Sequence, residues 1–307
     1  MSTFIQNTFL YLSKSRLANR LARRYGLRLG ARRFVAGETV EEAMVRVKAF
    51  NDRGIQATVD HLGEFVTSRA EAEAAAAAAI EALRAMDRAG VDAYLSVKLT
   101  QLGLDVDEAL AHAHMRRILS EAKRRGRFVR IDIEDYARNE ATFRLFRALL
   151  DEFGPETIGI AMQAYLYKSA DDLEALLPDR PNIRFVKGAY KEPPSVVYPN
   201  KADVDENYFR LVARHLSAGG YAAVATHDER LIERVKAYVR EAGIPRERFE
   251  FQMLYGIKES LLERLAREGY TARVYVPYGI DWYGYTMRRL AERPENAWFV
   301  LRSLFAR

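Results

Sequence analysis

The chain has 307 residues, a length that suits one large domain or two ordinary ones. It contains no cysteine, which excludes disulfides, thiolate-bound zinc, cysteine-ligated iron–sulfur clusters and a cysteine nucleophile. No run approaches the roughly 18 apolar residues that a membrane-spanning helix needs, and no signal-peptide pattern is present. We therefore expect a cytoplasmic protein.

The net charge of +6 belongs to the N-terminus. Residues 1–37 hold eight basic side chains and no acid, and removing these from the 48 basic residues leaves 40 against 42 acids. The rest of the chain is therefore close to neutral. It has no basic stripe interleaved with aromatic residues, so we expect no binding to nucleic acid.

The basic N-terminal segment is also amphipathic. Apolar residues recur in it at spacings of three to five, with arginines between them: Ile5, Phe9, Leu12, Leu17, Leu21 and Tyr25. One interpretation is that residues 1–35 lie on an anionic membrane surface, at the inner face of the cytoplasmic membrane. The other is a helix that packs its apolar stripe on the body of the protein or on a second subunit. The sequence leaves this choice and the oligomeric state open.

From about residue 55, short apolar runs alternate with helical stretches. The expected strands are 56–60, 93–98, 128–133, 157–163, 183–187, 222–226, 249–252 and 272–276. The expected helices are 69–89, 106–125, 141–153, one through 176, 203–218, 229–242, 258–268 and one that contains Arg288. Eight such pairs predict an α/β protein with a (β/α)8 TIM-like barrel, whose strands we expect to be apolar on both faces. An open doubly wound sheet is the alternative, but no Gly-x-Gly-x-x-Gly follows any strand.

The first 50 residues stand outside this count. We expect residues 1–50 to form a basic N-terminal helical arm and a capping helix near 39–51 at the base of the barrel. Residues 51–307 would then form the catalytic barrel domain. No linker separates two domains, and no internal repeat is present.

Polar residues gather where the expected strands end. In a (β/α)8 barrel the active site lies at the carboxyl ends of the strands. The residues expected there are Lys98, Asp132, Gln163, Arg184, Lys187, Gly188, Thr226, His227, Gln252 and Tyr275. Any one of them has a structural explanation, such as an ion pair between neighbouring strands. Their recurrence at seven strand ends indicates a functional mouth.

The C-terminal helix carries two adjacent arginines. Tyr285, Arg288, Arg289 and Glu292 fall at i, i+3, i+4 and i+7, so they share one helical face. Two guanidiniums beside tyrosines suit a small planar anion, because the guanidiniums bind a carboxylate bidentately while the rings cover its apolar body.

The expected mouth holds more cations than one small carboxylate requires, so we expect a second anionic ligand. Lys187-Gly188-Ala189 allows close backbone approach and, with Thr226-His227, could hold a pyrophosphate. Three chemistries remain open on spacing alone: a lyase that uses Lys98 as a Schiff base, a phosphate-ester isomerase, and a flavin oxidoreductase.

The motifs at these strand ends resemble those of proline dehydrogenase. The matching segments are LSVKLT at 95–100, RIDIE at 130–134, IAMQAY at 160–165, RFVKGAY at 184–190, ATHD at 225–228, FEFQMLYG at 249–256 and the stretch 275–292. The resemblance extends in order over residues 40–305. It is to the monofunctional bacterial form, because 307 residues leave no room for an aldehyde dehydrogenase domain.

The resemblance implies a role for each matching residue. Arg288, Arg289 and Lys98 would hold the proline carboxylate, while Tyr190, Tyr275 and Tyr285 would wall the ring against the flavin. Arg184 would lie by flavin N5, and Asp132 would fix its orientation. The implied FAD contacts are Ile133, Gln163, Lys187, Gly188, Ala189, Thr226, His227 and Gln252, with Glu292 orienting the site. Phe185 departs from the family, in which we expect a leucine that contacts substrate.

The implied activity is oxidation of L-proline to Δ1-pyrroline-5-carboxylate, the first step of proline catabolism to glutamate, with hydride passing from C5 to flavin N5. We expect non-covalent FAD, no metal, and a quinone or another carrier as electron acceptor. Two rival hypotheses are a Schiff-base lyase or aldolase that uses Lys98 on a small carboxylate, and a non-enzymatic carboxylate-binding or membrane-bound module on an inactive barrel.

Overall fold

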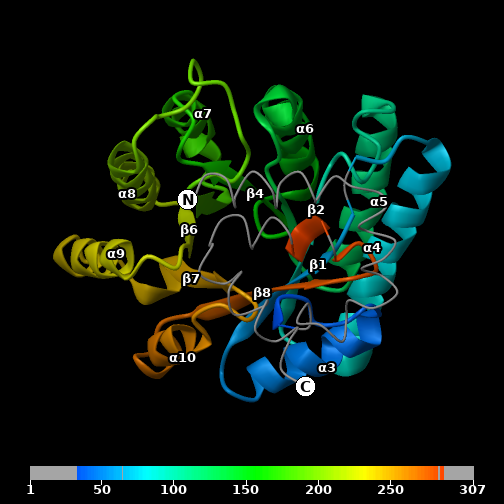
Figure 1. Ribbon diagram of the computed structural model, residues 1–307, viewed down its shortest axis with the longest axis horizontal. Helices are drawn as coiled ribbons and strands as arrows, with labels where there is room; N and C mark the ends of the chain where they lie inside the picture. Colours follow the sequence, from blue (N-terminus) through cyan, green and yellow to red (C-terminus); the bar gives the residue numbers. More distant parts are fainter. Residues whose placement is uncertain (1–32, 64, 283, 287–307) are drawn as a thin grey trace, which may run out of the picture.

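The computed structural model describes residues 33–63, 65–282 and 284–286. Eight parallel strands form a closed barrel in chain order, and β8 pairs back onto β1 (Figure 1). The strands are β1 Gln56–His61, β2 Ala93–Val97, β3 Val129–Ile131, β4 Ile158–Gln163, β5 Asn182–Val186, β6 Tyr221–Ala225, β7 Phe249–Leu254 and β8 Ala272–Tyr278. The predicted (β/α)8 barrel is confirmed, and the closed sheet excludes the doubly wound alternative.

Helices surround the barrel. They are α3 Val40–Asn51, α4 Arg69–Ala89, α5 Glu108–Arg124, α6 Tyr136–Phe153, α7 Ser169–Leu176, α8 Lys201–Ser217, α9 Glu229–Glu241 and α10 Glu259–Arg267. Two short 3₁₀ helices, η3 Leu177–Asp179 and η4 Arg246–Arg248, precede β5 and β7. None of the described helices is both long and apolar enough to cross a membrane.

Local capping explains where several helices begin. α4 begins after Ser68, whose side chain accepts a hydrogen bond from the Glu71 N–H while Glu71 bonds back to the Ser68 backbone. α6 begins at Tyr136 and not near residue 141 as predicted. The Asp135 side chain accepts from the Arg138 N–H, and this cap allows the helix to start one turn earlier than its apolar pattern suggested.

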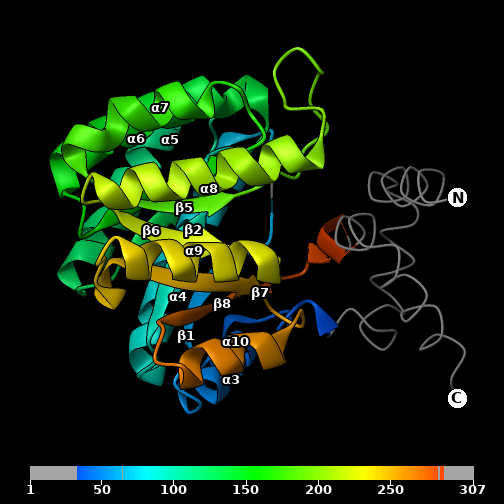
Figure 2. The ribbon, with the colours of Figure 1, turned by 90° about the vertical axis from the view of Figure 1, so that its left-hand side faces the viewer.

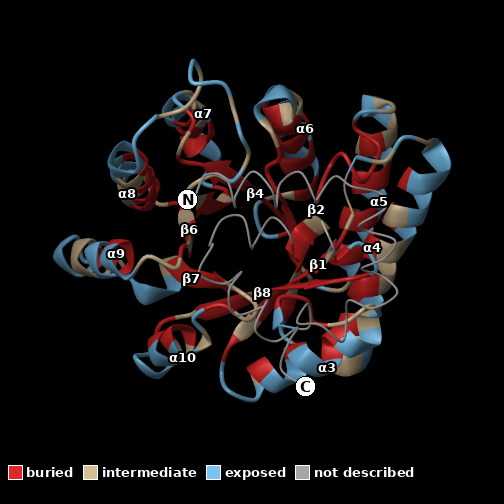
Figure 3. Cartoon of the chain, in the orientation of Figure 1, coloured by how far each residue is buried: buried red, intermediate tan, exposed pale blue. Residues whose placement is uncertain are grey.

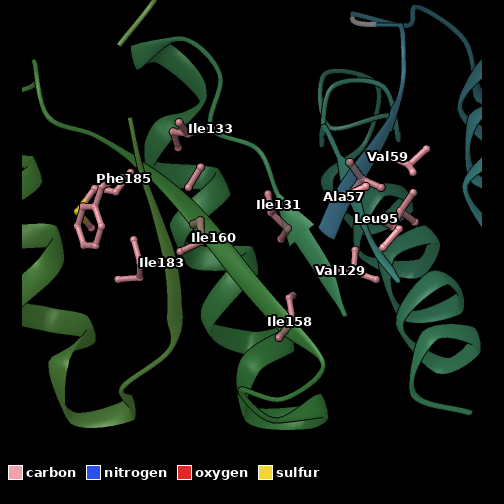
Figure 4. Close-up of a cluster of buried hydrophobic side chains, with 14 of the residues drawn as sticks. Ala57, Val59, Leu95, Val129, Ile131, Ile133, Ile158, Ile160, Ile183 and Phe185 are labelled. Carbon is pink, nitrogen blue, oxygen red and sulfur yellow. The ribbon is translucent and has the colours of Figure 1, made fainter. Parts of the chain in front are cut away.

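The hydrophobic core lies between the barrel wall and the helices (Figure 3). Outward-facing strand residues form it, among them Val59, Leu95, Ile131 and Ile160, which are at most 1% exposed (Figure 4). Helices contribute the other half of this layer, for example Leu83 and Met86 from α4. Burial of this apolar surface is the main stabilising contribution to the fold.

The inside of the barrel is polar, which corrects the prediction that the strands are apolar on both faces. Side chains from strands that are not neighbours meet across it: Arg130 of β3 donates to Asn182 of β5, and the Arg273 guanidinium of β8 lies over the Tyr94 ring of β2. Arg130, Glu250 and Arg273 are each at most 1% exposed. Aliphatic residues therefore occupy the outer face of the strands, and polar and charged side chains meet in the interior.

Helix α3 lies outside the barrel wall and not across its base, contrary to expectation. It packs along β1 and β8 and beside α4, so it takes a place in the outer ring between α10 and α4 (Figure 1). Its buried face consists of Ala43, Met44, Val47 and Phe50. The described residues that follow β8 lie at the carboxyl end of the barrel, and α3 covers the outer surface of β8 and β1.

The segment after β8 lies at the barrel mouth. Gly279 has a φ of 121°, a conformation that favours glycine, and its N–H donates to the carbonyl of Gly37. Trp282 and residues 284–286 are helical and lie beyond the carboxyl ends of the strands (Figure 2). The N-terminal side of the described chain meets the same end, because Ala36 donates to the Pro277 carbonyl.

Two valines of α3 test its packing. Val47 is fully buried, whereas Val45 is 68% exposed. We expect Val47→Ala to lower the free energy of unfolding by roughly 1–3 kcal/mol, because methyl groups leave a packed site and a cavity remains. Val45→Ala is the matched control and should change it by less than about 0.5 kcal/mol. Urea unfolding measures both, and equal effects would contradict this placement of α3.

Candidate active site

A buried ion pair occupies the centre of the barrel mouth. The Arg184 guanidinium of β5 donates through Nη1 to Asp132 Oδ1 at 2.5 Å, and Asp132 follows β3. Ser96 of β2 joins them, donating to Asp132 at 2.9 Å while its oxygen lies 3.1 Å from Arg184 Nη1. Burial alone would raise the pKa of Asp132, but the charges of Arg184 and Lys98 hold it below its usual range. The carboxylate is therefore ionised.

Lys98 is held by two carboxylates. Its ammonium lies 3.0 and 3.1 Å from the two oxygens of Asp60 on β1, and 3.5 Å from Asp132 Oδ2. Asp60 is 1% exposed and Lys98 9% exposed. Two anions at this distance stabilise the charged ammonium, and a charged ammonium cannot act as a nucleophile.

Tyr275 of β8 completes this central cluster. Its hydroxyl donates to Asp132 Oδ2 at 2.6 Å, and its ring lies 5.1 Å from the Arg184 guanidinium carbon. Burial, followed by the charges of Asp132 and Asp60, raises the pKa of the Tyr275 hydroxyl well above its usual value. The tyrosine therefore remains a hydrogen-bond donor at physiological pH.

Two glutamines extend the cluster to neighbouring strands. Gln252 of β7 accepts a hydrogen bond from Arg184 Nε at 2.7 Å. Gln163 of β4 donates to the Glu134 carbonyl at 3.1 Å, and its Oε1 is buried without a partner among the described residues. A buried acceptor without a partner costs free energy, so Gln163 Oε1 suits a ligand that donates a hydrogen bond.

A second group lies at the ends of β5 and β6. Lys187 forms ion pairs with Asp205 at 2.5 Å and with Asp228 at 3.0 Å. Although burial raises the pKa of Asp228, its contacts with Lys187 and Lys201 lower it to about 2. Gly188 has a φ of 120°, and the Tyr165 ring occupies the space that a side chain there would need.

The loops after β5 and β6 carry three further predicted cofactor contacts, Thr226, His227 and Ala189. His227 Nε2 accepts from the Leu254 N–H at 3.0 Å, which assigns its proton to Nδ1 when the ring is neutral. Thr226 Oγ1 accepts from the Asp228 N–H at 3.1 Å. Ile133 is buried after β3, and Ala189 is exposed in the loop after β5.

The structure brings together most, but not all, of the predicted site residues. Lys98, Asp132, Arg184, Gln252 and Tyr275 form one hydrogen-bonded cluster. The other described site residues lie at or just after the carboxyl ends of the strands. Among them, Tyr190 is in the loop after β5, and Tyr285 is buried in the helical turn at the mouth. Arg288, Arg289 and Glu292 lie outside the described residues.

Several details of the predictions are corrected. β2, β3, β5 and β6 end one or more residues earlier than predicted, so Lys98, Asp132, Lys187 and Thr226 lie in the turns that follow them. Phe185 does not face the mouth. It is fully buried on the outer face of β5, with its ring edge-on to His215 of α8 at 5.6 Å, because its neighbour Arg184 points inward.

The sequence analysis did not identify several strand residues that bind the predicted site residues. Asp60 binds Lys98, Ser96 binds Asp132 and Arg184, and Thr58 Oγ1 lies 3.5 Å from Arg184 Nη2. A signal for them exists in the sequence, because polar residues recur two apart. These pairs are Thr58 and Asp60, Ser96 and Lys98, Arg130 and Asp132, Glu250 and Gln252, and Arg273 and Tyr275. Residues two apart on a strand share one face.

Comparisons with known proteins agree with this geometry. The sequence pattern of the proline dehydrogenase family matches residues 43–302. The chain is 47% identical over 300 residues to proline dehydrogenase 1 of Bacillus subtilis subsp. natto, covering 98% of this chain and 99% of that protein. It is 50% identical over 277 residues to proline dehydrogenase of Deinococcus radiodurans, covering 89% of each.

A solved structure has the same fold. Proline utilization A (PutA) from Bdellovibrio bacteriovorus, inactivated by N-propargylglycine, superposes with a TM-score of 0.82 at 27% identity. The match covers 97% of this chain but 37% of that larger one.

The closed barrel thus places the chain among the (β/α)8 proteins, with a charged polar site where the strands end. The chain belongs to the proline dehydrogenase family, whose reaction is the oxidation of proline in proline catabolism. Family membership confirms the resemblance noted in the sequence. It also removes the lyase hypothesis, which the carboxylate-bound Lys98 independently disfavours.

Proposed function

We propose that the mouth binds FAD non-covalently together with L-proline, and that proline is oxidised to Δ1-pyrroline-5-carboxylate. The observation that carries this proposal is the buried Arg184–Asp132–Tyr275–Lys98 cluster at the mouth of a barrel of the proline dehydrogenase family. Bound FAD supplies the acceptor, flavin N5, for the hydride that leaves C5 of proline. The rest of the proposal concerns what the residues of the chain do.

Several described residues fit such a cofactor. Gln163 Oε1, which has no partner in the described part of the chain, suits a donor on the flavin ring or on its ribityl chain. Lys187, oriented by Asp205 and Asp228, supplies a cation for the pyrophosphate. The proposed contacts among the described residues are Ile133, Gln163, Lys187, Gly188, Ala189, Thr226, His227 and Gln252. Glu292, outside the described residues, is proposed to complete the cofactor site by orienting it. Non-covalent binding is supported by the absence of cysteine, since no thiol is available for a linkage.

Arg184 and Asp132 are the proposed catalytic residues. Arg184 is 3% exposed, so its positive charge is little screened by water. A cation at this place stabilises the negative charge that the acceptor gains when it is reduced. Asp132, Ser96 and Gln252 hold the guanidinium in one orientation, so it needs no rearrangement during the reaction.

Lys98 and the arginine pair are the proposed carboxylate ligands. Asp60 keeps Lys98 charged, which favours binding of a carboxylate. Arg288 and Arg289 would grip the two carboxylate oxygens, while Tyr190, Tyr275 and Tyr285 cover the ring and exclude water. Capture of the carboxylate at two points fixes the position of C5, and a fixed near-attack geometry accelerates the reaction.

We also propose that electrons leave on a quinone or another carrier, and that the basic arm of residues 1–35 attaches the enzyme peripherally to the inner face of the cytoplasmic membrane. About 1 kcal/mol for each basic residue near an anionic surface would give reversible binding. Phe34 and Val35 are each 1% exposed, so the last part of the arm belongs to the body of the protein.

Substitution of the arginine pair tests the carboxylate clamp. Each charge-assisted hydrogen bond contributes roughly 1.5–3 kcal/mol, so Arg288→Met or Arg289→Met should lower kcat/KM for proline about ten- to a hundredfold or more. Arg240→Met, at an exposed position at the end of α9, is the control and should match the parent. Near-parental kinetics in both clamp variants would refute their role.

Substitution of the central ion pair separates catalysis from binding. Arg184→Ala and Asp132→Ala should lower the rate of flavin reduction by proline far more than they weaken binding of an unreactive proline analogue. The reason is that both groups are proposed to act on the acceptor, and neither is a proposed ligand of the carboxylate. Anaerobic stopped-flow measures the first quantity and titration the second. If analogue binding collapses while reduction at saturation is preserved, these residues serve the substrate instead.

Deletion of residues 1–32 tests the arm and leaves the buried Phe34 and Val35 in place. Proline oxidation with a soluble dye should remain nearly intact, because no proposed site residue lies there. Co-sedimentation with anionic liposomes and quinone-coupled turnover should fall together, most clearly at low salt. Unchanged liposome binding would reject the membrane anchor, and loss of folded protein would favour packing of the arm on the body.

A further inference from the structure

A second layer of buried charge lies beneath the central cluster, farther from the mouth. Glu250 of β7 is fully buried, and Arg273 of β8 is 1% exposed. Arg273 Nε lies 3.1 and 3.0 Å from the two carboxylate oxygens of Glu250, and the Tyr221 hydroxyl donates to Glu250 Oε2 at 3.2 Å. Arg273 Nη1 also donates to the Ala57 carbonyl at 2.8 Å. This layer uses none of the residues assigned to proline or FAD.

One side chain connects the two layers. Gln252 lies two residues after Glu250 on β7 and therefore on the same face of the strand. Its Nε2 donates to Glu250 Oε1, and its Oε1 accepts from Arg184 Nε at 2.7 Å. Gln252 is 2% exposed, so water does not compete for these bonds.

The Gln252 amide lies between the Glu250 carboxylate and the Arg184 guanidinium, and these two partners allow only one orientation of it. An ionised carboxylate only accepts hydrogen bonds, and a guanidinium only donates them. Burial would raise the pKa of Glu250, but the charges of Arg273 and Arg130 hold it below its usual range, so Glu250 is ionised. The amide NH₂ must then face Glu250, and the amide oxygen must face Arg184.

We infer that Glu250, held by Arg273, is a positioning residue for Arg184 and acts through the Gln252 amide. Asp132 and Ser96 hold only the Nη1 side of the guanidinium, whereas this relay holds Nε. With both sides held, the guanidinium keeps one rotation in the mouth. The inference rests on the proposed function, because it assigns the relay to the flavin-side cation and not to the carboxylate ligands.

The alternative is that this layer only fills the lower barrel. The two roles differ in what they change. A purely structural layer affects the thermal midpoint of unfolding, whereas a positioning relay changes the reduction potential of the flavin and kcat and leaves substrate binding nearly unchanged.

Glu250→Gln is the first test, because a glutamine keeps the size but no longer dictates the orientation of Gln252. A second variant, Glu250→Met with Arg273→Met, removes both charges together, and replacement of a whole buried pair by apolar residues is commonly tolerated. Tyr221→Phe is the matched control, since it removes a hydrogen bond to Glu250 and leaves the Gln252 link in place.

The measurements on the FAD-loaded full chain are kcat and KM for proline, the flavin midpoint potential and absorption spectrum, and the dissociation constant of tetrahydro-2-furoate, a proline analogue with oxygen in place of the ring nitrogen. We expect both Glu250 variants to lose kcat at least tenfold, with a shifted midpoint potential and an analogue affinity within about twofold of the parent. Tyr221→Phe should keep the parental potential and kcat within about twofold.

Folded Glu250 variants with parental kcat and potential would overturn the inference, and so would an equal loss in Tyr221→Phe. Failure of the proposed function is seen separately in the parent chain. A parent that takes up no FAD, or whose flavin is not bleached by proline, contradicts the function, whereas an active parent with unaffected variants contradicts only the relay.

Discussion

The structure depends on the pairing of the charges that are buried at the mouth of the barrel. An ionised side chain taken out of water loses several kcal/mol of solvation unless an opposite charge and hydrogen bonds replace it. Arg184, Asp132, Lys98 and Asp60 meet this condition together at the mouth. Because each group needs its partners, none can rotate independently, and the same pairing that makes burial tolerable gives the site its fixed geometry.

Stability and chemistry are divided between the two faces of the strands. Outward-facing aliphatic residues such as Val59 and Ile160 pack against the helices and form the hydrophobic core. Many inward-facing residues are charged, and buried ion pairs of this kind contribute little net stability because desolvation offsets their attraction. A barrel with a polar interior can therefore still fold, because the apolar layer between its strands and helices supplies the hydrophobic core (Figure 4).

The interior charges form two layers along the barrel axis, and we assign a different role to each layer. The layer at the mouth contains the residues proposed to act on proline and FAD, and the layer beneath it contains Glu250, Arg273 and Arg130. Arg130 shows the cost of this arrangement: burial, followed by the charge of Arg184, lowers its pKa to about 9, and its Nε has no partner among the described residues. Burial of the Arg130 cation costs free energy, and a role of the lower layer in supporting the site at the mouth would account for that cost.

The sequence determined the closed parallel barrel, because eight apolar runs with intervening helices leave few other arrangements, and its motifs determined the family. It also identified Lys98, Asp132, Arg184, Gln252 and Tyr275 as mouth residues. Only the tertiary structure decided which of them touch, that Asp60 and Ser96 join them, that Phe185 faces α8 and that α3 covers β8 and β1. The physical reason is that periodicity reports which residues share a face of one strand, whereas contacts across a barrel join strands far apart in the chain, and their partners depend on how the whole sheet closes.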